Sequence, residues 1–341
     1  MKIAIHNSES GFSPRWVKYC QDHGIEYKIV NAYDSNIIKQ VQDCDAFMWH
    51  HNHVDYRDAL FAKQLIFALQ EKGLRVFPDY NTTWHFDDKI AQKYILEAVD
   101  APLVPSYVFY TKEEALSWAK DIEYPMVAKL RGGAGASNVC LIKGKHEMNS
   151  YVKKAFGKGF SQFNRIGYLK DKFISWKHNR IGIVRLLKSL CLAFMPSEHV
   201  FARMHPREKG YVLFQNFIPN NQYDIRICVV DGKAFALKRL CREGDFRASG
   251  SGRIIYDKDQ IDERCVSIAF ETNKKLKTQS IAFDFVFDQS NNPLIVEISY
   301  GYAVAAYDKC EGHWTEDMVW HPGTNFDFCG WMVEEIIRNK E

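Results

Sequence analysis

The 341-residue chain lacks any run of about 18 apolar residues that is free of charge, so the sequence predicts no membrane-spanning helix. Residues 1–6 do not begin an apolar stretch with a small-residue cleavage site, so we expect no secretory signal. The nine cysteines are scattered and never spaced C-x-x-C, which argues against a zinc site and against a disulfide framework. These absences together predict a cytoplasmic protein with reduced thiols.

A large net charge is also missing, because 45 basic and 42 acidic side chains leave only +3, which by itself argues neither for nor against nucleic acid. No nucleic-acid partner is expected. This near-neutrality hides one basic segment. Residues 151–210 carry 13 basic and 3 acidic side chains, a net charge of +10 that leaves −7 elsewhere. Within it, residues 181–194 are apolar except for Arg185 and Lys188. Three roles are open for this segment. It could lie on an anionic membrane, it could bind an anionic substrate, or it could be a solvated subdomain whose apolar stripe packs against the rest of the protein.

Short strands alternate with helices over the first 86 residues, which predicts a small parallel α/β sheet. From there to the C-terminus, strands and turns dominate apart from a few helices, which predicts α+β lobes with antiparallel sheets. We expect a helix at 88–99 with Asp87 as its N-cap, and a helix that opens at Thr111 with a capping box to Glu114. The predicted domains are 1–86, 87–210 with the basic insertion 151–210, and 211–341.

A glycine-rich loop follows the expected strand 126–131. Gly132, Gly133 and Gly135 leave backbone N–H groups accessible, as a loop that folds over phosphate requires. Lys129 precedes the loop and supplies a point charge for phosphate. The loop is not a Walker motif, because no G-K-S/T follows. The alternative interpretation is an ordinary hairpin loop.

Two acidic residues are expected to face each other on one hairpin. Residues 281–287 and 294–299 alternate in polarity around a turn rich in turn-forming residues, and a hairpin centred between residues 290 and 291 places Asp284 opposite Glu297. Like charges in that position repel, and a divalent cation would turn the repulsion into coordination. Ser299 lies on the same face, and an all-oxygen ligand set predicts Mg²⁺. The alternative is a pair of solvated acids.

A second hairpin is predicted around Asp231-Gly232, a dipeptide typical of two-residue type I′ turns. Its register places Asp224 opposite Arg239, with Arg226 on the same face. Arg247 follows in a polar, glycine-bearing loop. Three arginines could bind a carboxylate or an acyl phosphate and stabilise charge that develops during transfer, although Asp224 and Arg239 could also form a simple salt bridge.

Several aromatic and imidazole side chains are weaker candidates. His50, His51 and His53 follow the expected strand 46–49, where loops of α/β sheets face ligands. A zinc site there lacks a fourth ligand in the sequence, which favours a substrate-facing or an exposed loop. Tyr302 belongs to an aromatic tail that could contact substrate or pack into the core.

The order of these motifs along the chain resembles that of the ATP-grasp superfamily, and within it that of the branch that contains the ribosomal-protein glutamate ligase. The resemblance covers about residues 87–340 without the basic insertion, and residues 1–86 look like the α/β domain that precedes the ATP-grasp lobes. The motifs are Asp88-Lys89, Lys129 with its glycine loop, residues 213–218, Asp224-x-Arg226, residues 243–247, Asp284 and Glu297.

The resemblance implies an enzyme that uses ATP and Mg²⁺ to convert a carboxylate into an acyl phosphate, which an amine then attacks. It implies that Asp284, Glu297 and Ser299 hold the metal and that Arg226, Arg239 and Arg247 act in catalysis. In place of Ser299 the family usually has asparagine, a stronger oxygen ligand. The implied ATP-binding residues are Lys89, Lys129, Gly132, Gly133, Gly135, Gln215, Asn216, Phe217, Ile218 and Asp224.

The C-terminal tail, with Tyr300-Gly301-Tyr302, is similar to that of ATP-grasp proteins encoded in surface-polysaccharide gene clusters. This similarity implies a small-molecule or glycan carboxylate and an amine as substrates. Two alternatives remain open, a phosphotransferase of the same fold and a nucleotide-binding module without turnover. The sequence indicates no oligomeric state.

Overall fold

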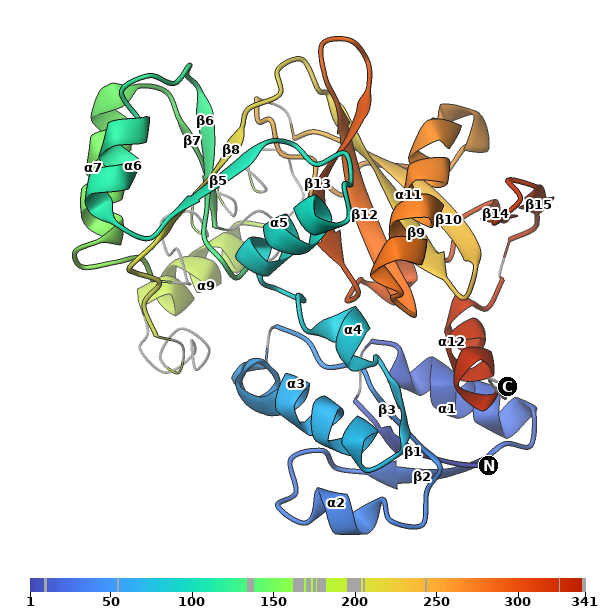
Figure 1. Cartoon of the computed structure of the whole chain (residues 1–341). Helices are drawn as coiled ribbons and strands as arrows, with labels where there is room; N and C mark the ends of the chain where they lie inside the picture. The colour runs from blue at the N-terminus through green and yellow to red at the C-terminus, as the bar shows by residue number, and fades with distance from the viewer. Residues whose placement is uncertain are drawn as a thin grey trace. The chain divides into compact units, whose positions relative to one another are not determined.

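A computed structural model describes residues 1–8, 11–53, 55–133, 138–161, 182–194, 206–242, 244–324 and 326–338, with isolated positions at 169, 173, 176 and 204. The chain forms two compact units, shown in Figure 1. The first contains residues 1–52, 57–104 and 218–341, and the second contains residues 53–56 and 105–217. The predicted division into three domains at 86 and 210 stays a prediction. Most of the basic insertion lies outside the described residues.

The first unit begins with a parallel four-stranded sheet in the order β2-β1-β3-β4, as the alternating pattern predicted. All four residues of β3 are buried, which is typical of a strand covered on both faces. The elements of this part are β1 (Lys2–His6), α1 (Ser13–Asp22), β2 (Glu26–Val30), α2 (Ile37–Gln40), β3 (Ala46–Trp49), α3 (Tyr56–Glu71), β4 (Arg75–Phe77), α4 (Tyr80–Thr83) and α5 (Lys89–Ala98).

The same unit contains a seven-stranded sheet in the order β13-β12-β9-β10-β14-β15, with β11 paired to β10. One face of its central strands is covered by α11, which packs Val266 and Phe270 against Ile227 and Phe283. The elements are β9 (Tyr223–Val230), β10 (Lys233–Leu240), β11 (Ile254–Ile255), η1 (Lys258–Gln260), α11 (Glu263–Leu276), β12 (Ser280–Phe287), β13 (Pro293–Ser299), η2 (Val304–Ala306), β14 (Gly312–Thr315), β15 (Trp320–Pro322) and α12 (Phe328–Ile337).

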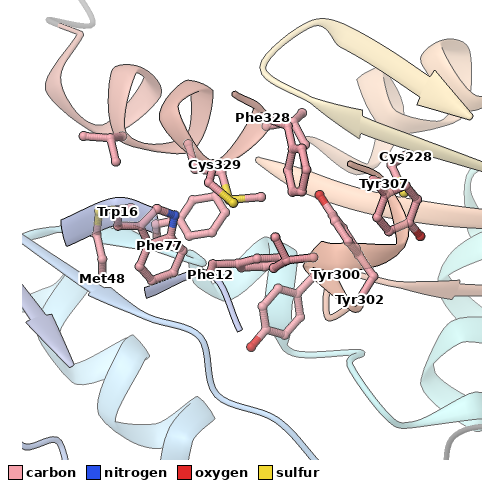
Figure 2. Packing of buried hydrophobic residues seen from close by; sticks show 14 of the residues in the cluster. Phe12, Trp16, Met48, Phe77, Cys228, Tyr300, Tyr302, Tyr307, Phe328 and Cys329 are labelled. Carbon is pink, nitrogen blue, oxygen red and sulfur yellow. The ribbon is translucent and has the colours of Figure 1, made fainter. Parts of the chain in front are cut away.

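The opposite face of this sheet is apolar at one end and contributes to a core shared with the N-terminal sheet. Phe235 lies at its centre, with ring centroids 4.9 Å from Phe328 and 5.2 Å from Tyr307. Figure 2 shows Phe12, Trp16 and Phe77 from the N-terminal part together with tyrosines and Phe328 from the C-terminal part. This core joins the two sheets of the first unit.

The second unit is built on an antiparallel sheet in the order β5-β8-β6-β7. Met126, Ala128 and Phe214 point to one face, where they pack with Met148 and Val152 of α7. Its elements are β5 (Ser106–Phe109), α6 (Lys112–Trp118), β6 (Met126–Lys129), β7 (Val139–Ile142), α7 (Lys145–Ala155), α9 (Ile183–Phe194) and β8 (Val212–Asn216). The antiparallel sheets of both units match the predicted lobes.

Two helix starts test the capping predictions. The hydroxyl of Thr111 accepts a hydrogen bond from the N–H of Glu114 at 3.3 Å, as predicted for α6. The prediction for α5 was wrong by one residue. Its N-cap is Asp88, whose Oδ1 accepts from Ile90 N and Ala91 N, whereas Asp87 has a left-handed backbone with φ of +51°. Among the described residues no helix is long and apolar enough to cross a membrane, as predicted.

Candidate functional site

The two predicted acids face each other across the β12–β13 hairpin. Asp284 pairs directly with Glu297 in the antiparallel ladder, which confirms the predicted register for this pair. A bulge follows, so that Phe285 pairs with Ile295. Residues directly opposed in such a ladder share a face, with Cβ atoms about 5 Å apart. Asp284 is buried, whereas 32% of the Glu297 side chain is exposed and open to a ligand.

Ser299 completes a row of oxygen donors on this face. It pairs with Ala282, two residues along the strand from Glu297, and its hydroxyl donates to the carbonyl of Gly301 at 2.9 Å. The lone pairs of the hydroxyl oxygen stay available as donors to a cation. In the described part of the chain, no three His, Cys, Asp or Glu residues form a metal-binding group. Two carboxylates and a hydroxyl on one face fit Mg²⁺, which takes one or two carboxylates and completes its shell with water and phosphate.

The β9–β10 hairpin has the predicted turn and register. Asp231 and Gly232 both have positive φ angles, +48° and +69°, as a type I′ turn requires. Asp224 pairs with Arg239, and Arg226, two residues along, lies on the same face. The turn chemistry thus places one acid and two arginines side by side.

Strand β12 brings Asp284 next to these arginines. Arg226 binds Asp284 with two nitrogens, one of them Nη2 at 2.6 Å from Oδ2, and Arg239 Nη2 lies 2.9 Å from the same oxygen. Arg239 also binds both carboxylate oxygens of Asp224, at 2.6 and 2.7 Å. We call Asp224, Arg226, Arg239 and Asp284 the charge network. Its two acids and two bases cancel one another in a buried environment.

Burial and pairing shift the two acids of the charge network in opposite directions. Burial raises the pKa of Asp224 above its ordinary value, although Arg239 opposes the shift. Burial also disfavours ionised Asp284, but Arg226 and Arg239 together outweigh it and lower its pKa below the ordinary value. As the pH falls, Asp224 therefore takes up a proton before Asp284 does. Asp284 is held as a carboxylate, the state that a metal ligand needs.

Lys89 brings a further cation to the hairpin acids. It is the first residue of α5, is buried, and places Nζ 3.4 Å from Oε1 of Glu297. Gln92, one turn later, accepts a hydrogen bond from Ile298 N at 3.4 Å, which ties α5 to β13. The sequence did not single out Gln92. Its spacing of three residues from Lys89 on a helix was the available signal.

Arg247 lies in the loop after β10, where its guanidinium binds Asp245 at 2.5 Å. Pairing with Arg247 lowers the pKa of Asp245 even though burial opposes the shift. The structure therefore shows a local ion pair within the loop, and a catalytic role for Arg247 stays a prediction.

In the second unit, Lys129 ends β6 immediately before the glycine loop. Its side chain is buried and, by strand alternation, points away from the face that packs on α7. Gly133 has φ of +114°, and a Cβ there would lie 2.3 Å from Asn138 Nδ2, so only glycine fits. Asn138 closes the base of the loop by donating to the carbonyl of Gly132 at 3.1 Å. Gly135 lies outside the described residues.

Tyr211 supports this loop, although no sequence motif indicated it. Its hydroxyl accepts a hydrogen bond from Arg131 N and donates to Glu208 Oε2, both at 2.7 Å. Burial, together with Glu208, raises the pKa of Tyr211 and keeps it neutral. The start of the glycine loop is thus anchored to the end of the basic insertion.

The residues predicted to hold adenine lie at the end of β8. Gln215 shares a sheet face with Lys129, and its amide donates to Ser106 Oγ at 3.0 Å. Asn216 N donates to Pro105 O, and the second unit ends at Phe217, with Ile218 opening the last segment of the first unit. These residues therefore lie where the chain passes from the second unit to the first.

The weaker candidates are mostly packed in the core. His51 is 2% exposed and bonds the hydroxyl of Thr83, and Tyr302 contacts Ser280 Oγ at 3.0 Å. Figure 2 shows Tyr302 among the aromatic side chains of the core. His50 stacks on Phe12 with centroids 3.8 Å apart, and His53 is half-buried. This placement lends no support to a substrate-contacting role for His51 or Tyr302.

Two family models match overlapping parts of the chain. The model for the carbamoyl-phosphate synthase L chain, ATP binding domain, matches residues 88–216, and the RimK-like ATP-grasp domain matches residues 198–312. Lys89 and Lys129 lie in the first match, and the charge network and Glu297 lie in the second. A curated relative, the 2-oxoglutarate carboxylase small subunit of Hydrogenobacter thermophilus, is 26% identical over 108 residues. That match covers 31% of this chain and 23% of the relative.

Solved structures share the fold over nearly the whole chain. A RimK domain ATP-grasp protein from Sphaerobacter thermophilus is 14% identical, with a TM-score of 0.57 and 99% of each chain covered. The biotin carboxylase domain of the Hydrogenobacter thermophilus 2-oxoglutarate carboxylase is 15% identical, with a TM-score of 0.59, and covers 100% of this chain and 70% of its own. That neighbour was solved with MgADP, ADP and bicarbonate. The predicted fold is confirmed, and the family model that matches residues 88–216 describes an ATP-binding domain.

Proposed function

We propose that the chain is an ATP- and Mg²⁺-dependent ligase of the ATP-grasp superfamily that joins a carboxylate to an amine. The two family models and the shared fold support this proposal. A carboxylate oxygen takes the γ-phosphoryl group of ATP, and ADP leaves. The amine nitrogen then bonds to the carbonyl carbon, and phosphate departs with the electron pair of the C–O bond, while the amine loses a proton. The observation that carries the proposal is the placement of Arg226, Arg239, Asp284 and Glu297 on one face of one sheet, with Lys89 of α5 in contact with Glu297.

The acids of the hairpin have the role of metal ligands in this proposal. Asp284, Glu297 and Ser299 would hold Mg²⁺, which when bound neutralises phosphate charge. Asp284 keeps its negative charge because Arg226 and Arg239 lower its pKa. Glu297 is the more accessible of the two carboxylates and exchanges its contact with Lys89 for the metal.

The cations of the site act on phosphate and on the developing acyl phosphate. Lys89 and Lys129 would contact the phosphates, and the N–H groups from Gly132 onward would close over them. Backbone atoms from Gln215 to Ile218 would hold the adenine. Arg226, Arg239 and Arg247 orient the carboxylate and stabilise its charge during transfer, since phosphoryl transfer depends on positioning and charge neutralisation more than on a protein nucleophile.

ADP release in the presence of paired acids and amines tests the proposal. The acid panel includes uronic acids, because the tail resemblance predicts a role in surface-polysaccharide modification. We expect ADP to form with at least one acid only when an amine is present, together with an amide product. The variant Glu297→Gln, at a position one-third exposed, should retain the fold and lose turnover at least about 100-fold.

Other outcomes identify other activities. ADP release without an amine, together with a stable phosphoester, would make the protein a phosphotransferase. ATP binding without hydrolysis over the whole panel would make it a nucleotide-binding module. Unchanged turnover in Glu297→Gln would remove the hairpin acids from the mechanism.

A further inference from the structure

Helix α9 (Ile183–Phe194), labelled in Figure 1, exposes apolar side chains outside the site described above. Ile183 is 50% exposed, Val184 64% and Leu187 54%. They stand at positions i, i+1 and i+4, so they share one side of the helix. These three large aliphatic side chains, each at least half exposed within five residues, form an exposed apolar patch. Such patches mark contact sites.

Positive charges border this patch on the same helix. Arg185 and Lys188 are both exposed. The helix belongs to the segment 151–210, whose net charge is +10 against −7 for the rest of the chain. Arg207 in the same segment bonds only to the backbone carbonyls of Lys158 and Gly159 in the described contacts, so its charge is not cancelled there.

We propose that α9 binds the surface of an anionic lipid bilayer. Ile183, Val184 and Leu187 would enter the boundary between headgroups and acyl chains, while Arg185 and Lys188 stay among anionic headgroups. A nucleic acid fits this surface less well, because it matches the charge but does not bury three aliphatic side chains. A bilayer accepts both. The proposal does not depend on the ligase activity.

Sedimentation with vesicles tests the proposal on the full chain. We expect the protein to pellet with vesicles that contain phosphatidylglycerol and phosphatidylcholine, and to stay largely in solution with phosphatidylcholine alone. The double variant Val184→Glu/Leu187→Glu should lose at least about tenfold in affinity. Leu60→Glu is the matched control, because Leu60 is 70% exposed on α3, and it should bind as the wild type does.

A second pair of substitutions isolates the charge. Arg185→Gln/Lys188→Gln should weaken binding by about fivefold per charge, since each cation near an anionic surface contributes about 1 kcal/mol. The effect should shrink as salt rises. MgATP binding measured on each variant shows that it is folded.

Two results would overturn the proposal. The first is equal binding of the wild type and Val184→Glu/Leu187→Glu to the anionic vesicles. The second is a change from dimer to monomer caused by that double variant in the absence of lipid, which would make a second copy of the chain the occupant of the patch. Because MgATP turnover is assayed without vesicles, either result leaves the ligase proposal standing.

Discussion

The face of the seven-stranded sheet that carries the charge network has two ends built from the same three strands. Alternate residues of β9 run from Asp224 and Arg226 to Cys228 and Val230, and β12 changes likewise from Asp284 to Ala282. One end therefore buries charged side chains and the other buries apolar ones, within about two residues along each strand. Strand geometry does not require this change, since both ends have the same pairing.

The two ends differ in what keeps them buried. At the apolar end, removal of surface from water favours packing by about 25 cal/mol per Å². At the charged end, burial is unfavourable unless every charge is paired, and apolar residues of similar volume are often as stable. Stability alone therefore does not account for four buried charges in that place. The following predictions separate the two ends.

Asp284→Asn should cause the largest effect because it breaks the charged end itself. Arg226 and Arg239 would then share only Asp224 as an acid of the network, and removing one partner of a buried ion pair costs about 3–5 kcal/mol. The metal position is lost as well. Denaturant unfolding should show the loss of stability. ADP release, assayed without denaturant at a temperature where the variant is folded, should fall at least about 100-fold. Wild-type values of both would exclude the network from stability and catalysis.

Phe235→Ala should destabilise as strongly but leave catalysis in place. Phe235 is fully buried among Tyr307, Phe328 and other aromatic side chains (Figure 2 shows the cluster), and deleting such a ring costs about 3–5 kcal/mol. Calorimetry or denaturant titration gives the stability, and the rate of ADP release below the unfolding transition gives the activity. The control Phe235→Leu should lose about 1 kcal/mol. A lower rate of ADP release in folded Phe235→Ala than in the wild type would show that the two ends are not separable.

The sequence predicted the local part of this arrangement and missed the long-range part. The Asp231-Gly232 turn fixes the β9–β10 register, so the pairing of Asp224 with Arg239 follows from turn chemistry. The Asp284 and Glu297 pair was also predicted, from a hairpin centred between residues 290 and 291. The pairs beside the turn are in fact centred on Ser290, and the bulge after Asp284 shifts the register by the one residue that brings Asp284 opposite Glu297. Contacts between segments far apart in sequence gave no comparable signal.

Two contacts show the reason. Arg226 meets Asp284 only because β12 lies beside β9, and Lys89 meets Glu297 across 208 positions of sequence. Neither period nor turn chemistry specifies which strand becomes the neighbour of which, because that choice depends on tertiary packing. The N-cap of α5 failed for a local reason. Two adjacent aspartates offer the same chemistry, and the left-handed backbone at Asp87 decided between them.

Two buried histidines beside the apolar end give a pH test of stability. His51 packs on Phe86, and His85 precedes it in the chain. Burial lowers the pKa of His85 to about 4 and that of His51 well below its usual range. As the pH falls below 6.5, the unfolded chain takes up protons at these histidines that the folded chain does not, so the free energy of unfolding decreases. The contribution of His85 to this decrease ends at about pH 4.

Removing one of these groups should flatten that curve. His85 alone accounts for about 2 kcal/mol between pH 7 and pH 5, from the difference between an ordinary pKa of 6.5 and a folded value of about 4. The variant His85→Phe should therefore lose less stability than the wild type over this range by that amount. Denaturant unfolding at a series of pH values measures it. Parallel curves for the two proteins would mean that His85 is not held neutral.

Asp224→Asn should have the smallest effect and decides whether Asp224 touches substrate or only holds Arg239. The carboxylate binds Arg239 with both oxygens, and asparagine keeps its shape without the charge. If Asp224 is a positioning residue, kcat/KM should fall about tenfold, equivalent to about 1.4 kcal/mol, with ATP affinity unchanged.

The pH profile separates this role from a purely structural one. Burial raises the pKa of Asp224, so in the wild type its protonation loosens Arg239 and contributes an acid limb above the range of an ordinary aspartate. Asparagine cannot titrate, and the limb should move to lower pH in Asp224→Asn. Arg239→Lys provides the complementary test, because lysine keeps the charge but cannot form the two-nitrogen contact with Asp224. It should match the rate loss of Asp224→Asn while retaining the acid limb. An unshifted acid limb in the pH profile of Asp224→Asn would show that Asp224 does not set that limb. A selective loss of ATP affinity would instead make Asp224 a direct ligand of the nucleotide.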